Sequence, residues 1–139
     1  MISMLNNTKA PYNINLLTSQ AALSALQPDA IAKMRSMVSL IRAERSKLLS
    51  SITEIPSVAN ILGANDANFI LVQIVDDNGK PSNDRAQQVY KELAEKLGVI
   101  VRFRGHECGC EGSLRITIGT PEQNEALLTK LREILGKSF

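Results

Sequence analysis

The stretch from residue 101 to residue 120 restricts the fold more than any other part of the chain. Two predicted strands, "VIVRFR" and "SLRITIG", lie on either side of the loop "GHECGCEG". Apolar and polar residues alternate in both segments, which is the period of a β-strand with one buried face. Because the connection is short, the pattern favours an antiparallel hairpin.

Alternation also sorts the side chains of this predicted hairpin between two faces. One face collects the apolar residues Val101, Phe103, Leu114, Ile116 and Ile118, which are expected to cover the core. The opposite face collects Arg102, Arg104, Arg115 and Thr117. A symmetric closure around the loop places Arg102 opposite Arg115, so the arginines are predicted to gather on one side of the sheet.

Like charges that face each other across a hairpin destabilise it by a fraction of about 1 kcal/mol. Carboxylates from elsewhere, open solvent or a bound anion would each compensate. Arginine suits the bound anion, because its planar guanidinium donates two parallel hydrogen bonds to a carboxylate or phosphate. A solvated basic face is the plainer alternative and stays open at this point.

Other uses of the loop have less support. His106, Cys108 and Cys110 are possible zinc ligands, but the chain holds no other histidine or cysteine to complete a site. A disulfide between the two cysteines would close an unfavourably short ring. The glycines are not followed by the Lys-Ser/Thr ending of a phosphate-binding loop. They are instead expected to allow tight turns.

Two helices are predicted ahead of the strands. Thr18 and Ser19 are expected to cap a short helix that runs through Leu26. The second helix begins near Asp29 and continues for roughly 24 residues, before Pro56. Its apolar stripe is Ile31, Met34, Val38, Ile41, Leu48 and Ile52, with Arg45 in the one polar slot. Helices of this length often link domains, although an ordinary core helix is an equal alternative.

The remaining segments complete an α+β pattern. "SVANIL" and "NFILVQIV" are predicted strands, and a helix follows from Asp84 to Gly98. Thr120, Pro121 and Gln123 form a strong helix start, and that helix is expected to reach Gly136. We therefore predict a two-layer small domain. Its three- to four-stranded, mostly antiparallel sheet carries helices on one face and is preceded by a long interdomain helix.

Composition limits the class of protein more than its activity. The chain has 139 residues and a net charge of +2, with basic residues spread along its length. This gives little support to nucleic acid as a partner. No apolar run approaches the roughly 20 residues of a membrane span. With two cysteines that form no disulfide framework, a reduced, cytoplasmic protein is expected.

Several segments, in order, resemble one family. "KAPYNIN", "DANFILVQI", "GVIVRFRG" and "LRITIGTPEQNEALLTKLREIL" are similar to the histidinol-phosphate aminotransferases. These are pyridoxal-phosphate enzymes of fold type I, and "ANDANFILVQI" resembles the fungal members in particular. "LRITIGT" alone is shared by several related aminotransferases. The likeness extends over essentially the whole chain and implies a role in histidine biosynthesis.

The resemblance also implies roles for individual residues. Arg115, in "LRITIGT", matches the family arginine that binds the anionic end of the substrate, and Arg102 matches a second arginine assigned to substrate phosphate. Tyr12 and Asn13, in "PYN", match a segment near the substrate site and the dimer contact. Arg104, His106 and the cysteines acquire no role from the family.

The family's Schiff-base lysine motif and its cofactor-pocket aspartate and asparagine are not found in the sequence. Lys9 lies in the "KAPYN" segment, downstream of where that lysine would lie. The resemblance therefore implies a C-terminal fragment that carries no catalytic residue, metal ligand or cofactor-binding residue. Residues 1–17 would be an arm from the cofactor domain, 18–55 a helical linker, and 56–139 the small domain.

Three functions follow as hypotheses. The first is a fragment of an enzyme that transfers an amino group between glutamate and imidazole-acetol phosphate, with pyridoxal phosphate and as a homodimer. The fragment alone is expected to be inactive and free of cofactor. The second is another aminotransferase, with an aromatic or phosphate-ester substrate. The third is a stand-alone α+β module that binds a small anion.

Overall fold

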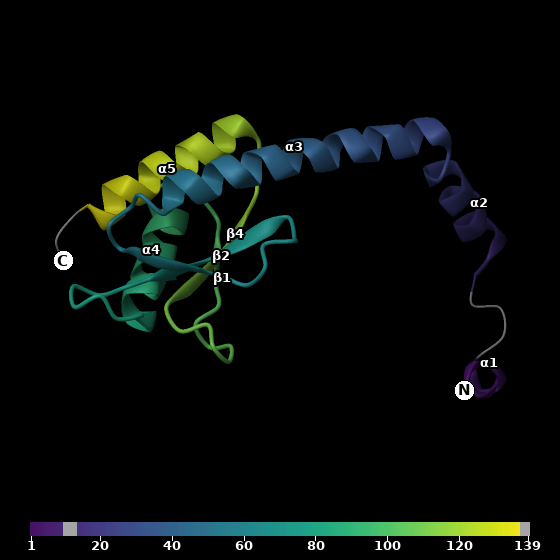
Figure 1. Cartoon of the computed structure of the whole chain (residues 1–139), viewed down its shortest axis with the longest axis horizontal. Helices are drawn as coiled ribbons and strands as arrows, with labels where there is room; N and C mark the ends of the chain where they lie inside the picture. Colours follow the sequence, from purple (N-terminus) through teal and green to yellow (C-terminus); the bar gives the residue numbers. More distant parts are fainter. Residues whose placement is uncertain (10–13, 137–139) are drawn as a thin grey trace. The chain divides into compact units, whose positions relative to one another are not determined.

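The computed structural model describes residues 1–9 and 14–136 of the chain. The described residues form helices and one sheet (Figure 1). In chain order the elements are α1 (Ile2–Thr8), α2 (Leu16–Ala25), α3 (Pro28–Ile52), β1 (Val58–Leu62), β2 (Phe69–Ile74), α4 (Asn83–Glu95), β3 (Arg102–Phe103), β4 (Ser113–Thr117) and α5 (Pro121–Leu135).

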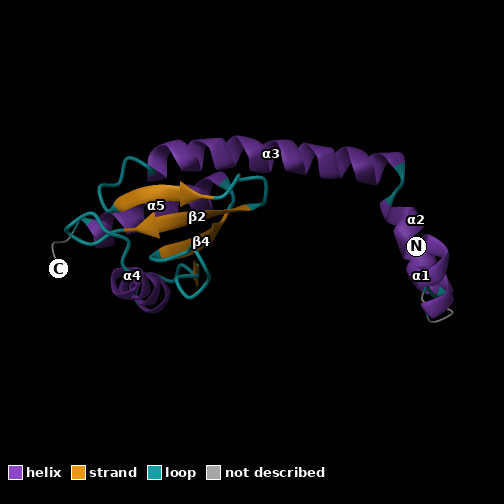
Figure 2. Ribbon diagram, turned by 60° about the horizontal axis from the view of Figure 1, so that its bottom comes forward, coloured by secondary structure: helices purple, strands orange, loops and turns teal. Residues whose placement is uncertain are grey.

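The four strands form an antiparallel sheet in the order β1-β2-β4-β3. This arrangement confirms the predicted α+β class and the predicted hairpin. Strand β4 lies inside the sheet and pairs with β2 on one side and β3 on the other. The sheet is seen in Figure 2 with α5 behind the strands. The C-terminal half of α3, together with α4 and α5, contributes to a single core on that face.

The core forms where the apolar side of the sheet meets the helices. Ile70, Val72 and Ile74 alternate along β2, and Leu114 and Ile116 alternate along β4; all five are at most 2% exposed. The helices pack Leu48, Ile52, Ala86, Val89, Leu93, Leu127, Leu128 and Leu131 against them. Burial of this apolar area, at about 25 cal/mol per Å², is the main term that holds the domain together.

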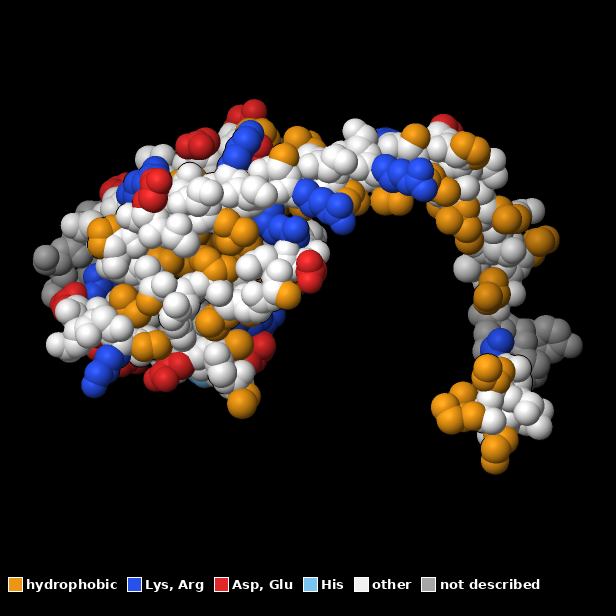
Figure 3. Space-filling model, in the orientation of Figure 1, with side chains coloured by type: hydrophobic (Ala, Val, Ile, Leu, Met, Phe, Trp, Pro, Cys, Tyr) orange, Lys and Arg blue, Asp and Glu red, His pale blue; other side chains and the backbone are white. Residues whose placement is uncertain are grey.

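The chain divides into two compact units, Met1–Val38 and Ser39–Phe139. In the first unit, α1 and α2 contain no buried residue. Apolar side chains are spread over the surface of these helices (Figure 3). The exposed ones include Met1, Ile2, Met4, Leu5, Leu16, Leu17, Leu23 and Leu26. The expected arm, linker and small domain stay predictions, since these units group residues by contact alone.

Helix α3 also has exposed apolar residues in its N-terminal part and buried ones in its C-terminal part. It runs from Pro28 to Ile52, close to the predicted bounds. Of the predicted stripe, Leu48 and Ile52 are buried, whereas Met34 and Val38 are exposed. The periodicity identified the face of the helix correctly, but only the C-terminal part of that face is covered by described residues.

Two local predictions are wrong. The cap of α2 is Asn15, whose side-chain oxygen accepts the Thr18 backbone N–H at 2.8 Å. Thr18 therefore lies inside the helix as a donor. The strand predicted over residues 99–104 is also too long, since β3 is only Arg102–Phe103. The Val99 amide instead donates to Leu93 O at 2.8 Å, in the turn that follows α4. In addition, helix α1 was not predicted.

The predicted start of α5 is confirmed. The Thr120 hydroxyl accepts the Gln123 backbone N–H, and the Gln123 side chain accepts the Thr120 N–H in return. This reciprocal capping box, with Pro121 in the first turn, satisfies two backbone donors that a helix start leaves free. The end of β4 is thereby fixed to the beginning of α5.

Candidate anion-binding site

The hairpin of β3 and β4 places two arginines directly opposite each other. Arg102 pairs with Arg115, and Phe103 pairs with Leu114. This is the register that symmetric closure around the loop predicts. Both arginines belong to the side of the sheet opposite the helices, which we call the helix-free face. Its residues are Asn60, Leu62, Phe69, Leu71, Gln73, Arg102, Ser113, Arg115 and Thr117.

The register of the hairpin is held by Asn83, the first residue of α4. Its side-chain oxygen accepts the Gly112 backbone N–H at 2.7 Å, and its side-chain nitrogen donates to Gly105 O at 3.3 Å. One side chain thus joins both ends of the loop. Gly112 has a φ of +68°, and a Cβ there would lie 2.6 Å from Ile74 O. Only glycine fits this position without a shift of the backbone.

Arg115 is partly buried and carries a positive charge that its surroundings do not neutralise. Among the described residues, no carboxylate lies within ion-pair distance of it. Its Nε atom is buried and has no hydrogen-bond partner there. Its Cζ lies 5.2 Å from the centroid of the Phe69 ring. A buried donor without an acceptor is costly, so this group is suited to receive one from a bound anion.

The other two arginines of the hairpin differ from Arg115 and from each other. Arg102 is exposed, and none of the ion pairs within the described residues involves it. Arg104 lies 3.4 Å from the Glu107 carboxylate, so its charge is partly compensated. The two unneutralised arginines are therefore the two that the resemblance singled out. Their juxtaposition forms a cationic site on one face of the sheet.

The amide side chains at the other end of the helix-free face have hydrogen-bond partners. Asn60 donates from its side chain to the Gln73 side-chain oxygen at 2.9 Å, and Gln73 donates to Glu111 O at 2.9 Å. Leu62 and Leu71 are partly buried neighbours. An incoming anion would therefore meet unused hydrogen-bond donors at the arginines and not at this end of the face.

Of the histidine and cysteines of the loop, His106 makes a ring contact. The rings of His106 and Phe103 meet edge to face, with centroids 4.9 Å apart. Cys108 and Cys110 are both free thiols. Within residues 1–9 and 14–136, no group of three histidine, cysteine or acidic side chains is arranged to hold a metal ion.

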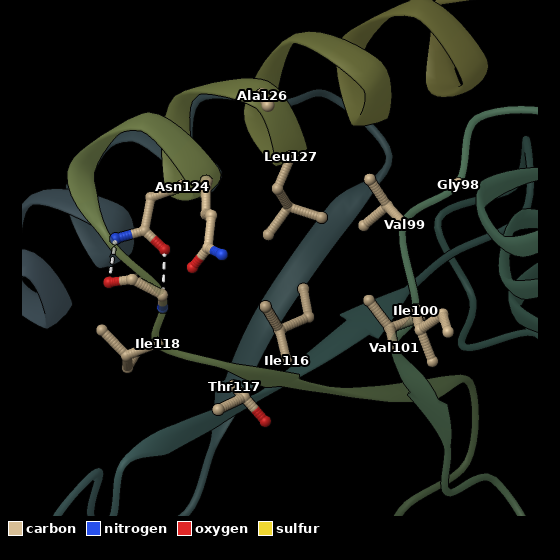
Figure 4. A pocket seen from close by; sticks show the side chains of 12 residues that line it. Gly98, Val99, Ile100, Val101, Ile116, Thr117, Ile118, Asn124, Ala126 and Leu127 are labelled. Carbon is tan, nitrogen blue, oxygen red and sulfur yellow. Dashed lines mark hydrogen bonds between the residues drawn. The ribbon is translucent and has the colours of Figure 1, made fainter.

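A hollow of about 390 Å³ lies between α5, the end of β4 and the segment that leads into β3 (Figure 4). Its lining is uncharged and consists of Gly98, Val99, Ile100, Val101, Ile116, Thr117, Ile118, Gly119, Gln123, Asn124, Ala126 and Leu127. Without a cationic side chain in its wall, this hollow does not suit a carboxylate or a phosphate. The candidate anion site is the arginine pair on the helix-free face.

A buried polar network, which the sequence pattern did not predict, fixes the connection after β4. Glu44 of α3 is 4% exposed and accepts hydrogen bonds from Asn124 at 3.1 Å and Lys47 at 2.8 Å. Asn124 also accepts the Gly119 N–H at 2.9 Å, a contact drawn in Figure 4. The hydrogen bond from Lys47, followed by that from Asn124, lowers the pKa of Glu44. Glu44 lies three positions after Ile41 of the predicted apolar stripe, and this helical spacing was the one sequence signal that it could face the core.

The next residue of α3 fixes a second loop. Arg45 donates from Nη1 to Ala67 O at 2.8 Å, in the connection between β1 and β2. The Ile118 N–H donates to Asn68 O at 2.9 Å, which joins the start of β2 to the end of β4. Consecutive residues of one helix thus hold the end of the sheet where Phe69 and Arg115 lie.

Two predicted site residues cannot be placed in this geometry. Tyr12 and Asn13 lie outside the described residues. Three of the described lysines already have hydrogen-bond partners. Lys47 has a raised pKa, because its hydrogen bond to Glu44 favours the charged form. Lys130 donates to Leu97 O and Lys96 pairs with Glu92.

Comparison with known proteins assigns the family. The profile of the family described as "Aminotransferase class I and II" matches residues 1–131. A small α+β domain with an arginine-bearing antiparallel sheet agrees with that match. The chain belongs to the class I and II aminotransferases.

The more specific likeness is to one branch of the family. The chain is 46% identical over 139 residues to the histidinol-phosphate aminotransferase of Schizosaccharomyces pombe, a match that covers 99% of the chain and 36% of that protein. It is 44% identical over 135 residues to the same enzyme of Saccharomyces cerevisiae, a match that covers 96% of this chain and 34% of that protein. The chain thus spans about a third of the length of the curated relatives it matches.

Solved structures share the fold at lower sequence identity. A decarboxylase from Sulfurospirillum multivorans superposes with a TM-score of 0.79 at 23% identity, over 99% of this chain and 33% of the other. The histidinol-phosphate aminotransferase from Clostridium acetobutylicum superposes with a TM-score of 0.76 at 19% identity, over 96% of this chain and 37% of the other. The described helices include no segment long and apolar enough to cross a membrane.

Proposed function

We propose that this chain supplies the small, substrate-binding part of a histidinol-phosphate aminotransferase. The proposal is supported by 46% identity along the whole chain to such an enzyme. The observation that carries it is the cationic site itself. Arg115 has a buried Nε without an acceptor and faces Arg102 across the hairpin, and neither residue has a carboxylate partner among the described residues.

The proposed substrates fit that site by charge. Glutamate presents carboxylates, and histidinol phosphate and imidazole-acetol phosphate present a phosphate. The fork of Arg115 would bind the carboxylate of glutamate in one half-reaction and help to hold the phosphate-bearing substrate in the other. Arg102, more exposed, would bind the substrate phosphate. Holding the anionic group at a fixed point orients the reacting end of the substrate and lowers the entropic part of the barrier.

The cofactor would be held elsewhere. Pyridoxal phosphate, when bound, supplies the electron sink for amino-group transfer. Because the family's Schiff-base lysine motif is not found in this sequence, which spans 36% of the Schizosaccharomyces pombe enzyme, we propose that the capturing lysine belongs to a part of the enzyme that this sequence does not cover. Tyr12 and Asn13 are proposed to lie near the substrate and the dimer contact. A cytoplasmic homodimer is the proposed form of the whole enzyme, and this chain alone would be inactive.

A chimeric enzyme tests the proposal. The aligned third of the Schizosaccharomyces pombe enzyme is replaced by this chain, and amino transfer from glutamate to imidazole-acetol phosphate is followed. The expected result is turnover within about tenfold of the parent enzyme, with growth of a histidine auxotroph restored. A chimera that folds and binds pyridoxal phosphate, yet prefers an aromatic or other phosphate-ester substrate, would point to another branch of the family.

A second candidate function has its own supporting observation. Both arginines and the elements that hold them lie within this one chain, so an anion site without cofactor is conceivable as a stand-alone binding module. Calorimetry on the 139-residue chain separates the two. Micromolar binding of histidinol phosphate by the chain alone would favour the module. Millimolar or weaker binding is expected if the chain supplies only part of the site.

A further inference from the structure

We infer that Phe69 is a positioning residue for the substrate anion, because its ring holds the Arg115 guanidinium in place without consuming its charge or its donors. The inference rests on the proposed function of Arg115 and adds a residue to it. Phe69 was expected only as part of a strand. The structure gives it a second role, since the Arg115 Cζ lies 5.2 Å from the centroid of its ring.

The contact follows from the strand register. Arg115 of β4 pairs with Leu71 of β2, and Phe69 pairs with Thr117. Phe69 and Arg115 are therefore diagonal neighbours on the helix-free face. Aromatic and long side chains bridge that diagonal separation. A guanidinium within about 6 Å of a ring centroid is attracted by the negative face of the ring.

The choice of an aromatic ring has a chemical consequence. Arg85, in the same domain, is held by the Asp77 carboxylate at 2.6 Å, an anchor that also compensates its charge. A carboxylate next to Arg115 would compete with an incoming carboxylate or phosphate. The Phe69 ring contacts the guanidinium through its face and accepts none of its hydrogen bonds through a carboxylate. Restraint before binding reduces the side-chain entropy that an anion must otherwise overcome.

The backbone next to Phe69 is itself held in place by hydrogen bonds. The two residues before it are tied by their backbone oxygens: Ala67 O accepts from Arg45, and Asn68 O accepts the Ile118 N–H. Phe69 therefore cannot shift easily along the sheet. The guanidinium is supported by a rigid element, as a preorganised binding group requires.

The test compares Phe69→Leu, which keeps an apolar side chain but removes the aromatic face, with Phe69→Tyr, which keeps the face. Phe103→Leu is the matched control, because the same change is made at a ring that contacts His106 and not Arg115. In the chimeric enzyme, Phe69→Leu should raise the KM for glutamate about fivefold and leave kcat within about twofold. Phe69→Tyr and Phe103→Leu should leave both constants within about twofold of the unmodified chimera.

A double-mutant cycle with Arg115→Ala ties the effect to the proposed contact. Once Arg115 is removed, Phe69→Leu should have no further effect on the KM. Equal effects of Phe69→Leu with and without Arg115, or no effect of Phe69→Leu at all, would overturn the inference. Urea unfolding of each variant distinguishes a loss of fold from a loss of positioning.

The 139-residue chain provides a readout without turnover. The Nε–Hε resonance of Arg115 is followed by NMR while glutarate, a dicarboxylate probe, is added. The resonance should shift in the unmodified chain, and Phe69→Leu should raise the glutarate Kd by about the same fivefold. If Arg115→Ala leaves the glutarate affinity of the chain unchanged, as measured by calorimetry because the variant lacks the Arg115 resonance, the proposed function fails as well. If only Phe69→Leu is without effect, the function stands and the positioning role is wrong.

Discussion

The two faces of the sheet differ in how completely their groups are satisfied. On the helix-covered face, Leu114 and Ile116 are at most 2% exposed and belong to the apolar core cluster. On the helix-free face, Arg115 has a buried Nε without an acceptor and no carboxylate partner among the described residues. Along β4, successive side chains point to the two faces in turn, so residues of both kinds are neighbours in the same short strand.

This difference indicates a division of work between folding and binding. A face that is fully packed contributes to the free energy of unfolding, and its residues are sensitive to any loss of volume. A face with unused donors contributes little to stability and keeps its interactions for a ligand. Substitutions at neighbouring positions of β4 should therefore have effects of different kinds.

The largest effect on stability is expected from Leu114→Ala. Removing this fully buried side chain leaves a cavity and should lower the free energy of unfolding by about 3 kcal/mol. The matched substitution on the other face, Arg115→Leu, should change it by less than about 1 kcal/mol. Urea denaturation of both variants measures the contrast, and similar losses from the two would remove the distinction between the faces.

A smaller loss is expected from Asn124→Ala. Asn124 is 4% exposed and joins Glu44 to both backbone groups of Gly119, so its removal leaves buried groups unpaired. The expected cost is about 2 kcal/mol, measured by urea denaturation. Glu125→Ala, one residue further along and exposed, should cost less than about 0.5 kcal/mol. If the two variants unfold alike, the network does not stabilise the end of β4.

The cap of α5 should contribute less again. Thr120→Ala removes the hydroxyl that accepts the Gln123 N–H and should cost about 1 kcal/mol. Thr120→Ser, which keeps the hydroxyl, serves as the control and should retain most of that stability. Thermal unfolding followed by circular dichroism is sufficient to rank the three proteins. A Thr120→Ser variant as unstable as Thr120→Ala would contradict the role of the hydroxyl.

The smallest expected effect is a change in pH dependence at Glu44. Its pKa is lowered by the hydrogen bonds from Lys47 and Asn124, so its ionised form stabilises the folded chain. That contribution is fully present above the ordinary glutamate value of about 4.3 and is lost as the pH falls through the lowered pKa. Glu44→Gln should flatten the acid side of the stability profile. A Glu44→Gln variant whose stability profile between about pH 3 and pH 7 matches that of the unmodified chain would contradict the assignment.

The sequence predicted the elements that depend on local pattern. Alternation around the loop was sufficient to place Arg102 opposite Arg115, because side chains in a strand alternate strictly and the loop closes symmetrically. The capping box at Thr120 was also predicted from local sequence. These features need no knowledge of distant contacts.

Features that depend on tertiary contacts could not be predicted. Asn83 joins the two ends of the hairpin loop from another helix, and Glu44 contacts Asn124 across 80 positions of the chain. Phe69 was predicted as a strand residue, but its contact with Arg115 depends on which strands are neighbours and in what register they pair. Val99 was predicted to begin a strand, but its backbone N–H donates to Leu93 O in the turn after α4. The strand β3 therefore begins only at Arg102.

The central claim is that Arg115 binds the substrate anion, and the kinetics of Arg115→Ala in the chimeric enzyme test it most directly. Losing a charge-assisted, partly buried contact should reduce kcat/KM for glutamate about 100-fold, while the variant remains folded and retains pyridoxal phosphate. Arg115→Lys, which keeps the charge but not the planar fork, should recover only part of the loss. A kcat/KM within about threefold of the unmodified chimera would contradict the account.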